Sequence, residues 1–289
     1  SSQENHRYLR EKAGYFFLDD LCLISAKGSD LFSYLQTQTT NDVNELKPGQ
    51  GQNNAIVDRK ARVISTFSLH RTGEESAVIL VETQQKENLL NHLNSFLFRE
   101  DVTLTSSSHF VLALQGPKSQ EIIKSFTRSN DSIPEKPNDI CKFTFEGLPA
   151  LAIAKSLTGE EGCVLAFQTE SEDTITKKLL EFEQQNILIQ VDPHAQEVFR
   201  IESGIPSYGK DINDKNILPE TGLEHSSVSY NKGCYIGQEV IARIKTYGAP
   251  NFALMGLIIE GDTLPSHDNE IKLNSKKLGV IKSSIFSYS

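Results

Sequence analysis

The residue of this chain most able to do chemistry is Cys234, which lies in the string Lys232-Gly233-Cys234-Tyr235-Ile236-Gly237-Gln238-Glu239. Apolar residues recur at helical spacing directly after this string, which predicts a short helix starting next to the cysteine. A thiol near a helix N-terminus and beside a lysine has a stabilised thiolate, which lowers the pKa of the thiol. A lone cysteine is more often a small buried apolar residue, so the surrounding string has to decide between the two interpretations.

That string resembles the K-G-C-Y-x-G-Q-E signature of the folate-binding YgfZ family, which is related to the glycine-cleavage T-protein, an aminomethyltransferase. A second stretch, residues 200–206, reads R-I-E-S-G-I-P and is similar to a pattern of the same superfamily, as is the L-P-E at 218–220. Residues 40–43 read T-N-D-V and resemble a third family segment, although such a polar run is also typical of a loop held by side-chain turns. We therefore interpret the chain as a relative of these folate-binding proteins.

The resemblance implies roles for four residues. Glu202 stands where the family binds the pterin ring, and a carboxylate can accept two parallel hydrogen bonds from such a ring. Lys232 or Arg243 could meet the anionic glutamate tail of a folate, and Cys234 would be the functional thiol. The alternative for Glu202 is a structural ion pair with Arg200 or Arg243, and Lys232 and Arg243 could equally be surface residues. The cofactor that the resemblance implies is tetrahydrofolate or another reduced folate.

The resemblance also leaves the activity open between several functions. The T-protein branch transfers a one-carbon unit to folate with the help of an acidic pair, but Ser65 and Thr66 stand at the matching positions here. Neither hydroxyl acts as a general base near neutral pH without an activating partner. The main hypothesis is therefore a folate-binding accessory protein for iron–sulfur cluster assembly or repair, with iron–sulfur client or assembly proteins as partners. The alternative is aminomethyltransferase-type transfer to tetrahydrofolate, and the third possibility is a scaffold that binds a partner and no ligand.

Composition and charge argue against several classes of protein and of site. The net charge of −9 over 289 residues argues against a nucleic-acid interface, and no apolar run is long enough to predict a membrane span. The four cysteines show neither C-x-x-C pairing nor zinc-type spacing with histidine, and one cysteine cannot hold an iron–sulfur cluster, so no metal site is predicted. The N-terminal residues 1–12 lack the apolar core of a secretory signal. We expect a cytoplasmic protein, or a protein of the mitochondrial matrix if the source is eukaryotic.

The elements that must position these residues indicate an α+β fold. Alternating strands are interleaved with amphipathic helices, the clearest of which is predicted over residues 86–98, and no βαβ rhythm or glycine fingerprint occurs. The resemblance implies a two-lobed folate-binding unit over residues 1–247, with its lobes interleaved in sequence and a central cleft between them that holds Glu202. Short strands predicted after Pro250 match the start of the family's small C-terminal β-barrel. We expect that barrel, residues 248–289, to be incomplete.

Overall fold

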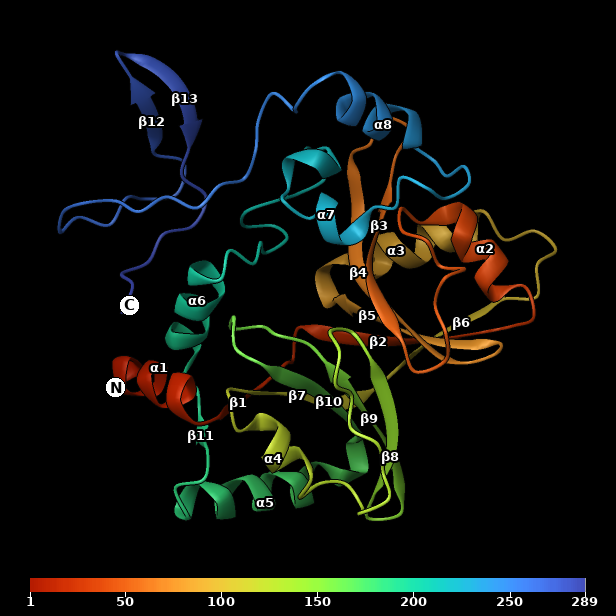
Figure 1. The fold of residues 1–289 in the computed structure, drawn as a ribbon, viewed down its shortest axis with the longest axis vertical. Coiled ribbons are helices and arrows are strands. Elements are labelled where there is room, and N and C mark those ends of the chain that lie inside the picture. The colour runs from red at the N-terminus through yellow and green to blue at the C-terminus, as the bar shows by residue number, and fades with distance from the viewer. Residues whose placement is uncertain (289) are drawn as a thin grey trace.

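Two β-sheets form the centre of the protein in the computed structural model, which describes residues 1–288 (Figure 1). One sheet has six strands, in the order β11 (Ile189–Gln190), β1 (Gly14–Phe17), β7 (His109–Gln115), β10 (Gly162–Gln168), β9 (Leu148–Ala154) and β8 (Ile140–Phe145). The other sheet has five, in the order β3 (Gly51–Val57), β4 (Val63–Gly73), β5 (Ser76–Glu82), β2 (Leu21–Lys27) and β6 (Thr103–Ser107). The prediction of a mixed fold of strands and helices is confirmed.

The chain enters the two sheets alternately. It contributes β1 to the six-stranded sheet, builds the whole five-stranded sheet with β2 to β6, and then returns to the first sheet. The neighbouring strands are antiparallel except for β1 and β11, which pair in parallel with Gly14 opposite Ile189. The two sheets are therefore interleaved in sequence.

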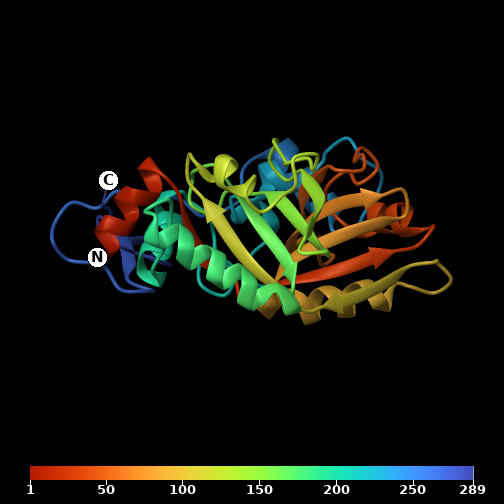
Figure 2. The ribbon, with the colours of Figure 1, turned by 90° about the horizontal axis from the view of Figure 1, so that it is seen from below.

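Helices cover the outer face of each sheet, because their apolar stripes repeat at the helical period. The six-stranded sheet carries α4 (Ser119–Ile123) and α5 (Glu172–Gln184), and Figure 2 shows α5 running along it. The five-stranded sheet carries α2 (Leu31–Gln38) and α3 (Thr83–Ser95). The predicted helix over 86–98 thus exists but lies three residues earlier. A third apolar core joins the inner faces of the two sheets and includes Leu23, Leu80 and Val164.

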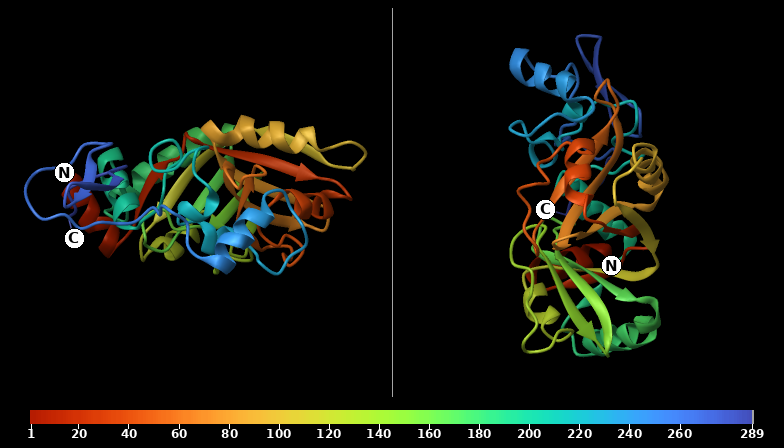
Figure 3. Two further views of the ribbon diagram at one scale, coloured as in Figure 1. Left: turned by 90° about the horizontal axis from the view of Figure 1, so that it is seen from above. Right: turned by 90° about the vertical axis from the view of Figure 1, so that its right-hand side faces the viewer.

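The remaining helices follow the second sheet in sequence. They are α6 (Pro193–Glu202), the 3-10 turns η1 (Thr169–Ser171) and η2 (Leu218–Glu220), α7 (Glu224–Ser227) and α8 (Gln238–Tyr247). The helix α6 begins at Pro193, as an Asp-Pro pair indicates. Asp192 caps it by accepting a 3.0 Å hydrogen bond from the amide of Ala195. An N-terminal helix, α1 (Ser2–Glu11), packs against α6. Figures 1 and 3 show α7 and α8 at the end of the molecule away from α4 and α5.

The predicted C-terminal barrel is not confirmed, and up to residue 288 no closed barrel is present. The segment from Phe252 to Ile259 was expected to be a strand, but it is unpaired and exposes Met255 and Ile258. Two strands, β12 (Glu270–Leu273) and β13 (Lys276–Val280), form an isolated hairpin. The physical reason is that neither finds a third strand in the described chain, and two strands alone cannot close a barrel. No helix of the described part is long and apolar enough to cross a bilayer.

Candidate functional site

The segment that carries Cys234 is fixed to the polar run before β3. The ammonium of Lys232 is 8% exposed and donates hydrogen bonds of 2.6 Å to the carbonyl oxygen of Thr39 and 2.7 Å to that of Asn41. Burial lowers the pKa of this amine to about 8, although the nearby carboxylate of Asp42 acts in the opposite direction. Lys232 is therefore engaged inside the protein, which makes the predicted contact with a folate tail unsupported by its position.

The polar run itself is a tightly bonded structural unit. The hydroxyl of Thr40 donates to the carbonyl of Ser227 at 2.5 Å and accepts from the amide of Ala55 at 3.1 Å. The amide side chain of Asn41 donates to the carbonyls of Asn53 at 2.9 Å and Ser226 at 3.3 Å. Two of the segments that resembled the family therefore meet here, because these bonds join residues 39–42 both to β3 and to the stretch that leads into Lys232.

Cys234 lies on this anchored loop, where its side chain is exposed. The loop reaches α8 through Gly237, which has a left-handed backbone with φ of +84°. A β-carbon at that position would lie 2.5 Å from the carbonyl oxygen of Asp58 and 2.7 Å from a methyl carbon of Val57, so only glycine fits. The helix therefore starts close to Cys234, as predicted, and the thiol is open to solvent and not a buried apolar residue.

Glu202 ends α6 and its side chain is buried among partners from both ends of the chain. One carboxylate oxygen accepts a hydrogen bond from Arg10 at 3.0 Å and lies 2.8 Å from the imidazole Nε2 of His6. The other accepts from the hydroxyl of Ser287 at 2.6 Å and from the amide of Tyr288 at 3.3 Å. Burial alone would raise the pKa of Glu202, but the hydrogen bonds from Ser287, His6 and Arg10 outweigh it and lower the pKa to about 2.

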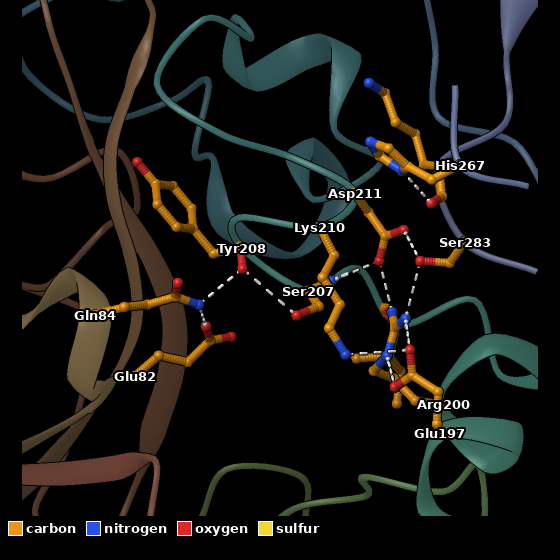
Figure 4. Close-up of polar contacts among 12 residues, drawn as sticks. Glu82, Gln84, Glu197, Arg200, Ser207, Tyr208, Lys210, Asp211, His267 and Ser283 are labelled. Carbon is orange, nitrogen blue, oxygen red and sulfur yellow. Dashed lines mark hydrogen bonds and ion pairs between the residues drawn. The ribbon is translucent and has the colours of Figure 1, made fainter. Parts of the chain in front are cut away.

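Glu202 does form an ion pair, as the alternative interpretation expected, but its partner is Arg10 and not Arg200 or Arg243. Arg200 points instead to Asp211 at 2.6 Å and Glu197 at 2.8 Å, in the network of Figure 4. Arg243 is exposed on α8 and pairs with Glu239 at 2.9 Å. Neither arginine contacts Glu202. Sequence could not name His6 and Arg10 as its partners, because the helix that carries them, α1, has too few apolar residues to be predicted.

Two open hollows lie on the described surface, and one of them is next to Glu202. The larger has a volume of about 450 Å³ and is lined by Gln3, Glu4, His6, Arg7, Arg10, Glu11 and Tyr288. The smaller, of about 280 Å³, is lined by Gly49, Thr72, Ser132, Ile140, Cys141 and Lys142. Glu202 lies behind the first, since three of its partners, His6, Arg10 and Tyr288, line it. Neither hollow is lined by Cys234. Within residues 1–288 no group of three or more histidine, cysteine or acidic side chains is placed to hold a metal ion.

Ser65 and Thr66, which the resemblance placed at the position of an acidic pair, lie on β4. Ser65 is fully buried and its hydroxyl has no hydrogen-bond partner. Thr66 turns to the other face of the strand, and its amide donates to the side-chain oxygen of Gln85 at 2.8 Å. Sequence reasoning overlooked Gln85 and the neighbouring Glu82, although a glutamate directly after the buried run of β5 was a usable signal.

Comparison with known proteins identifies the fold and the family of this chain. The structure matches the crystal structure of glycine cleavage system aminomethyltransferase T from Bartonella henselae, with a TM-score of 0.73 over 86% of this chain and 67% of that chain, at 19% identity. The family model described as GCVT N-terminal domain matches residues 1–232. The chain therefore belongs to the GCVT family.

Curated relatives agree with this assignment. An aminomethyltransferase from Bacillus cytotoxicus is 26% identical over 98% of this chain and 77% of its own length. An aminomethyltransferase from Halalkalibacterium halodurans is 27% identical over 97% of this chain and 77% of its own length. The finer resemblance to the YgfZ branch, which depends on the string around Cys234, stays a prediction.

Proposed function

We propose that this chain binds tetrahydrofolate or a related reduced folate. The observation that carries the proposal is the family match over residues 1–232, which spans both sheets and α6. The motif around Glu202 supports it further, because a buried carboxylate held in its ionised form is suited to accept hydrogen bonds from a pterin. For Glu202 to do so it has to exchange one of its present partners for the ligand. The contacts from Ser287 and Tyr288 are the ones to give way, since they come from the segment after β13, which belongs to no helix or strand of the described residues.

The first candidate for the use of that folate is one-carbon transfer of the aminomethyltransferase type. The named activity of the curated relatives supports this candidate directly. The missing carboxylates at Ser65 and Thr66 count against it. Measuring transfer of a one-carbon unit from an aminomethyl donor to tetrahydrofolate decides the question, and transfer above the rate of the buffer alone would support it.

The second candidate is the thiol-dependent accessory function toward iron–sulfur proteins, and Cys234 favours it. The thiol is exposed on a loop that Lys232 and Gly237 hold in place, which is an arrangement suited to contact with a partner. Cys234→Ser should keep folate affinity and stability, because a hydroxyl is nearly isosteric with a thiol. It should abolish rescue of iron–sulfur enzyme activity in cells that lack the protein. Full rescue by the serine variant would remove this candidate and leave one-carbon transfer in place.

Folate binding itself is tested by fluorescence titration with tetrahydrofolate. We expect Glu202→Gln to weaken binding by roughly tenfold to a hundredfold, since a hydrogen bond to a charged group contributes about 1.5–3 kcal/mol. Glu197→Gln is the matched control, because Glu197 lies on the same helix and also pairs with an arginine but has no assigned ligand contact. Unfolding midpoints of both variants separate lost affinity from lost structure. Unchanged affinity in a folded Glu202→Gln protein would refute the role of this residue.

A further inference from the structure

Glu202 shares its arginine with a second carboxylate, that of Glu160. The guanidinium of Arg10 donates from Nη2 to Glu202 at 3.0 Å and from Nη1 to Glu160 at 2.7 Å. The arginine comes from α1, whereas Glu202 ends α6 and Glu160 lies in the loop between β9 and β10. Three segments that are distant in sequence therefore meet at one guanidinium, next to the larger hollow, which Arg10 lines.

The loop that carries Glu160 is fixed by a buried carboxamide. Gln115, at the end of β7, is fully buried, and its side chain forms hydrogen bonds of 2.8 and 2.9 Å with the main chain of residues 155–157. The loop then passes close to the residue after α6, because a β-carbon at Gly159 would lie 2.5 Å from the hydroxyl oxygen of Ser203. The fold therefore sets where the Glu160 carboxylate lies.

Further contacts hold the Arg10 guanidinium in its bridging position. Nη1 also donates to the carbonyl oxygen of Thr158 at 3.4 Å, and the guanidinium carbon lies 5.0 Å from the centre of the Phe199 ring. Because Nη1 is turned to the loop, Arg10 reaches Glu202 through Nη2 and bonds its oxygen Oε2. The other oxygen, Oε1, accepts from residues 287–288, whose contacts are the ones that give way to a ligand.

An arginine beside a carboxylate has a second way to pair with it. The planar guanidinium can form two parallel hydrogen bonds, one to each carboxylate oxygen. Without the loop to hold Nη1, Arg10 could turn this fork on Glu202 and occupy Oε1 as well as Oε2. A pterin offers a similar pair of parallel donors, so the arginine and the ligand would then compete for the same edge of the carboxylate.

We propose that Glu160 is a positioning residue for ligand binding, which holds Nη1 of Arg10 and thereby keeps Oε1 of Glu202 available to a pterin. The inference rests on the proposed binding of a reduced folate at Glu202. Removing the Glu160 side chain leaves the charges of Arg10 and Glu202 in place. The loss of affinity that we expect therefore comes from an oxygen occupied by the arginine and not from a missing ligand contact.

The test measures the affinity of the whole protein for tetrahydrofolate by fluorescence titration. Glu160→Ala should weaken binding by about tenfold, because the ligand has to displace the arginine from a charged hydrogen bond. Glu161→Ala is the matched control, since Glu161 is the exposed neighbour in the same loop, and it should bind like the wild type. Unfolding midpoints show whether each variant is folded.

Arg10→Lys provides a readout that a merely structural role of Glu160 would not change. The lysine ammonium is a point charge and cannot form the two-bond fork with a carboxylate. In the Arg10→Lys protein, Glu160→Ala should therefore cause no further loss of affinity. An equal tenfold loss with arginine and with lysine at position 10 would show that Glu160 acts independently of the fork, and would overturn the inference.

The outcomes separate this inference from the proposed function. Wild-type protein that does not bind tetrahydrofolate overturns both. Wild-type protein that binds it, with unchanged affinity in a folded Glu160→Ala variant, overturns the role of Glu160 alone, and so does an equal loss in Glu161→Ala. If Glu160→Ala does not fold, Glu160→Gln decides, because a neutral carboxamide fills the same volume and holds an arginine less strongly. Unchanged affinity in that variant would likewise overturn the inference.

Discussion

The buried amine of Lys232 should make the stability of the protein rise with pH above neutrality. In the unfolded chain this amine keeps its proton up to a pKa of about 10.5, whereas in the folded protein burial lowers the pKa to about 8. Between these values the unfolded state binds more protons, so raising the pH favours the folded state. The free energy of unfolding should therefore increase by about 2.5 kcal/mol between pH 7 and pH 10 from this group alone.

Lys232→Met removes the titrating group and should remove this increase. At pH 10 the variant should be less stable than the wild type, because the carbonyls of Thr39 and Asn41 lose their donor, which costs about 1–3 kcal/mol for a buried acceptor. At pH 7 the difference should be smaller or reversed, since the wild type there carries the full cost of a buried charge. Urea unfolding at both values, followed by circular dichroism under reducing conditions, measures the four free energies.

Lys155 is a second lysine on which the same pH dependence can be tested. Burial also lowers the pKa of Lys155 to about 8, so Lys155→Met should remove an increment of its own. The two effects should add, because Lys155 directly follows β9 of the six-stranded sheet, whereas Lys232 is bonded to the polar run before β3. If Lys232→Met and the wild type gain the same stability between pH 7 and pH 10, the ammonium is not held between the two carbonyls as described.

Three further outcomes follow from particular residues. Gly237→Ala should lower the free energy of unfolding by about 2–4 kcal/mol in urea titrations, because of left-handed strain and the close carbonyl of Asp58; a loss below 1 kcal/mol contradicts the loop geometry. Burial lowers the pKa of His70 from 6.5 to about 3. Between these values the imidazole stays neutral in the folded protein and gains a proton in the unfolded chain, so the free energy of unfolding decreases as the pH is lowered. His70→Gln should lose about 2 kcal/mol less than wild type between pH 6.5 and pH 4.5, and equal losses would count against a neutral, buried imidazole. Alkylation with peptide mapping should label Cys234 well before Cys163, whose pKa burial raises to about 12; equal rates would show that Cys163 is accessible.

Sequence predicted the elements with strong local signals. The Asp-Pro pair at residues 192–193 is a local start signal for α6, and apolar residues at helical spacing indicate α3 and α5. These signals can be used because each acts over a few residues. The N-terminal helix α1 was missed, since only His6 and Leu9 on it are buried and the rest is polar. The barrel was expected because short strands predicted after Pro250 match the start of the family's barrel. Alternation of apolar and polar residues indicates a strand with two different faces, but it does not indicate which strands pair with it.

The candidate site also has parts that sequence predicts and parts that it cannot predict. The residues around Cys234 correctly located a helix start, since helical spacing of apolar residues is a local signal. The destination of the Lys232 ammonium could not be predicted, because its acceptors are main-chain carbonyls almost two hundred residues earlier in the chain. The pairing of Glu202 with Arg10 could not be predicted for the same reason. Contacts of this kind depend on how distant segments meet, and one sequence carries no local sign of them.

The interleaving of the two sheets sets an order in which the protein can form during translation. All strands of the five-stranded sheet lie within residues 21–107, so that sheet can assemble once this part has left the ribosome. The strand β1 is made first but has to wait for β7, and its parallel neighbour β11 is synthesised about 170 residues later. Until then β1 presents an unpaired edge with Tyr15 and Phe16, which is a typical start for aggregation. A nascent chain stalled before residue 190 should therefore depend on a chaperone more than the finished protein does.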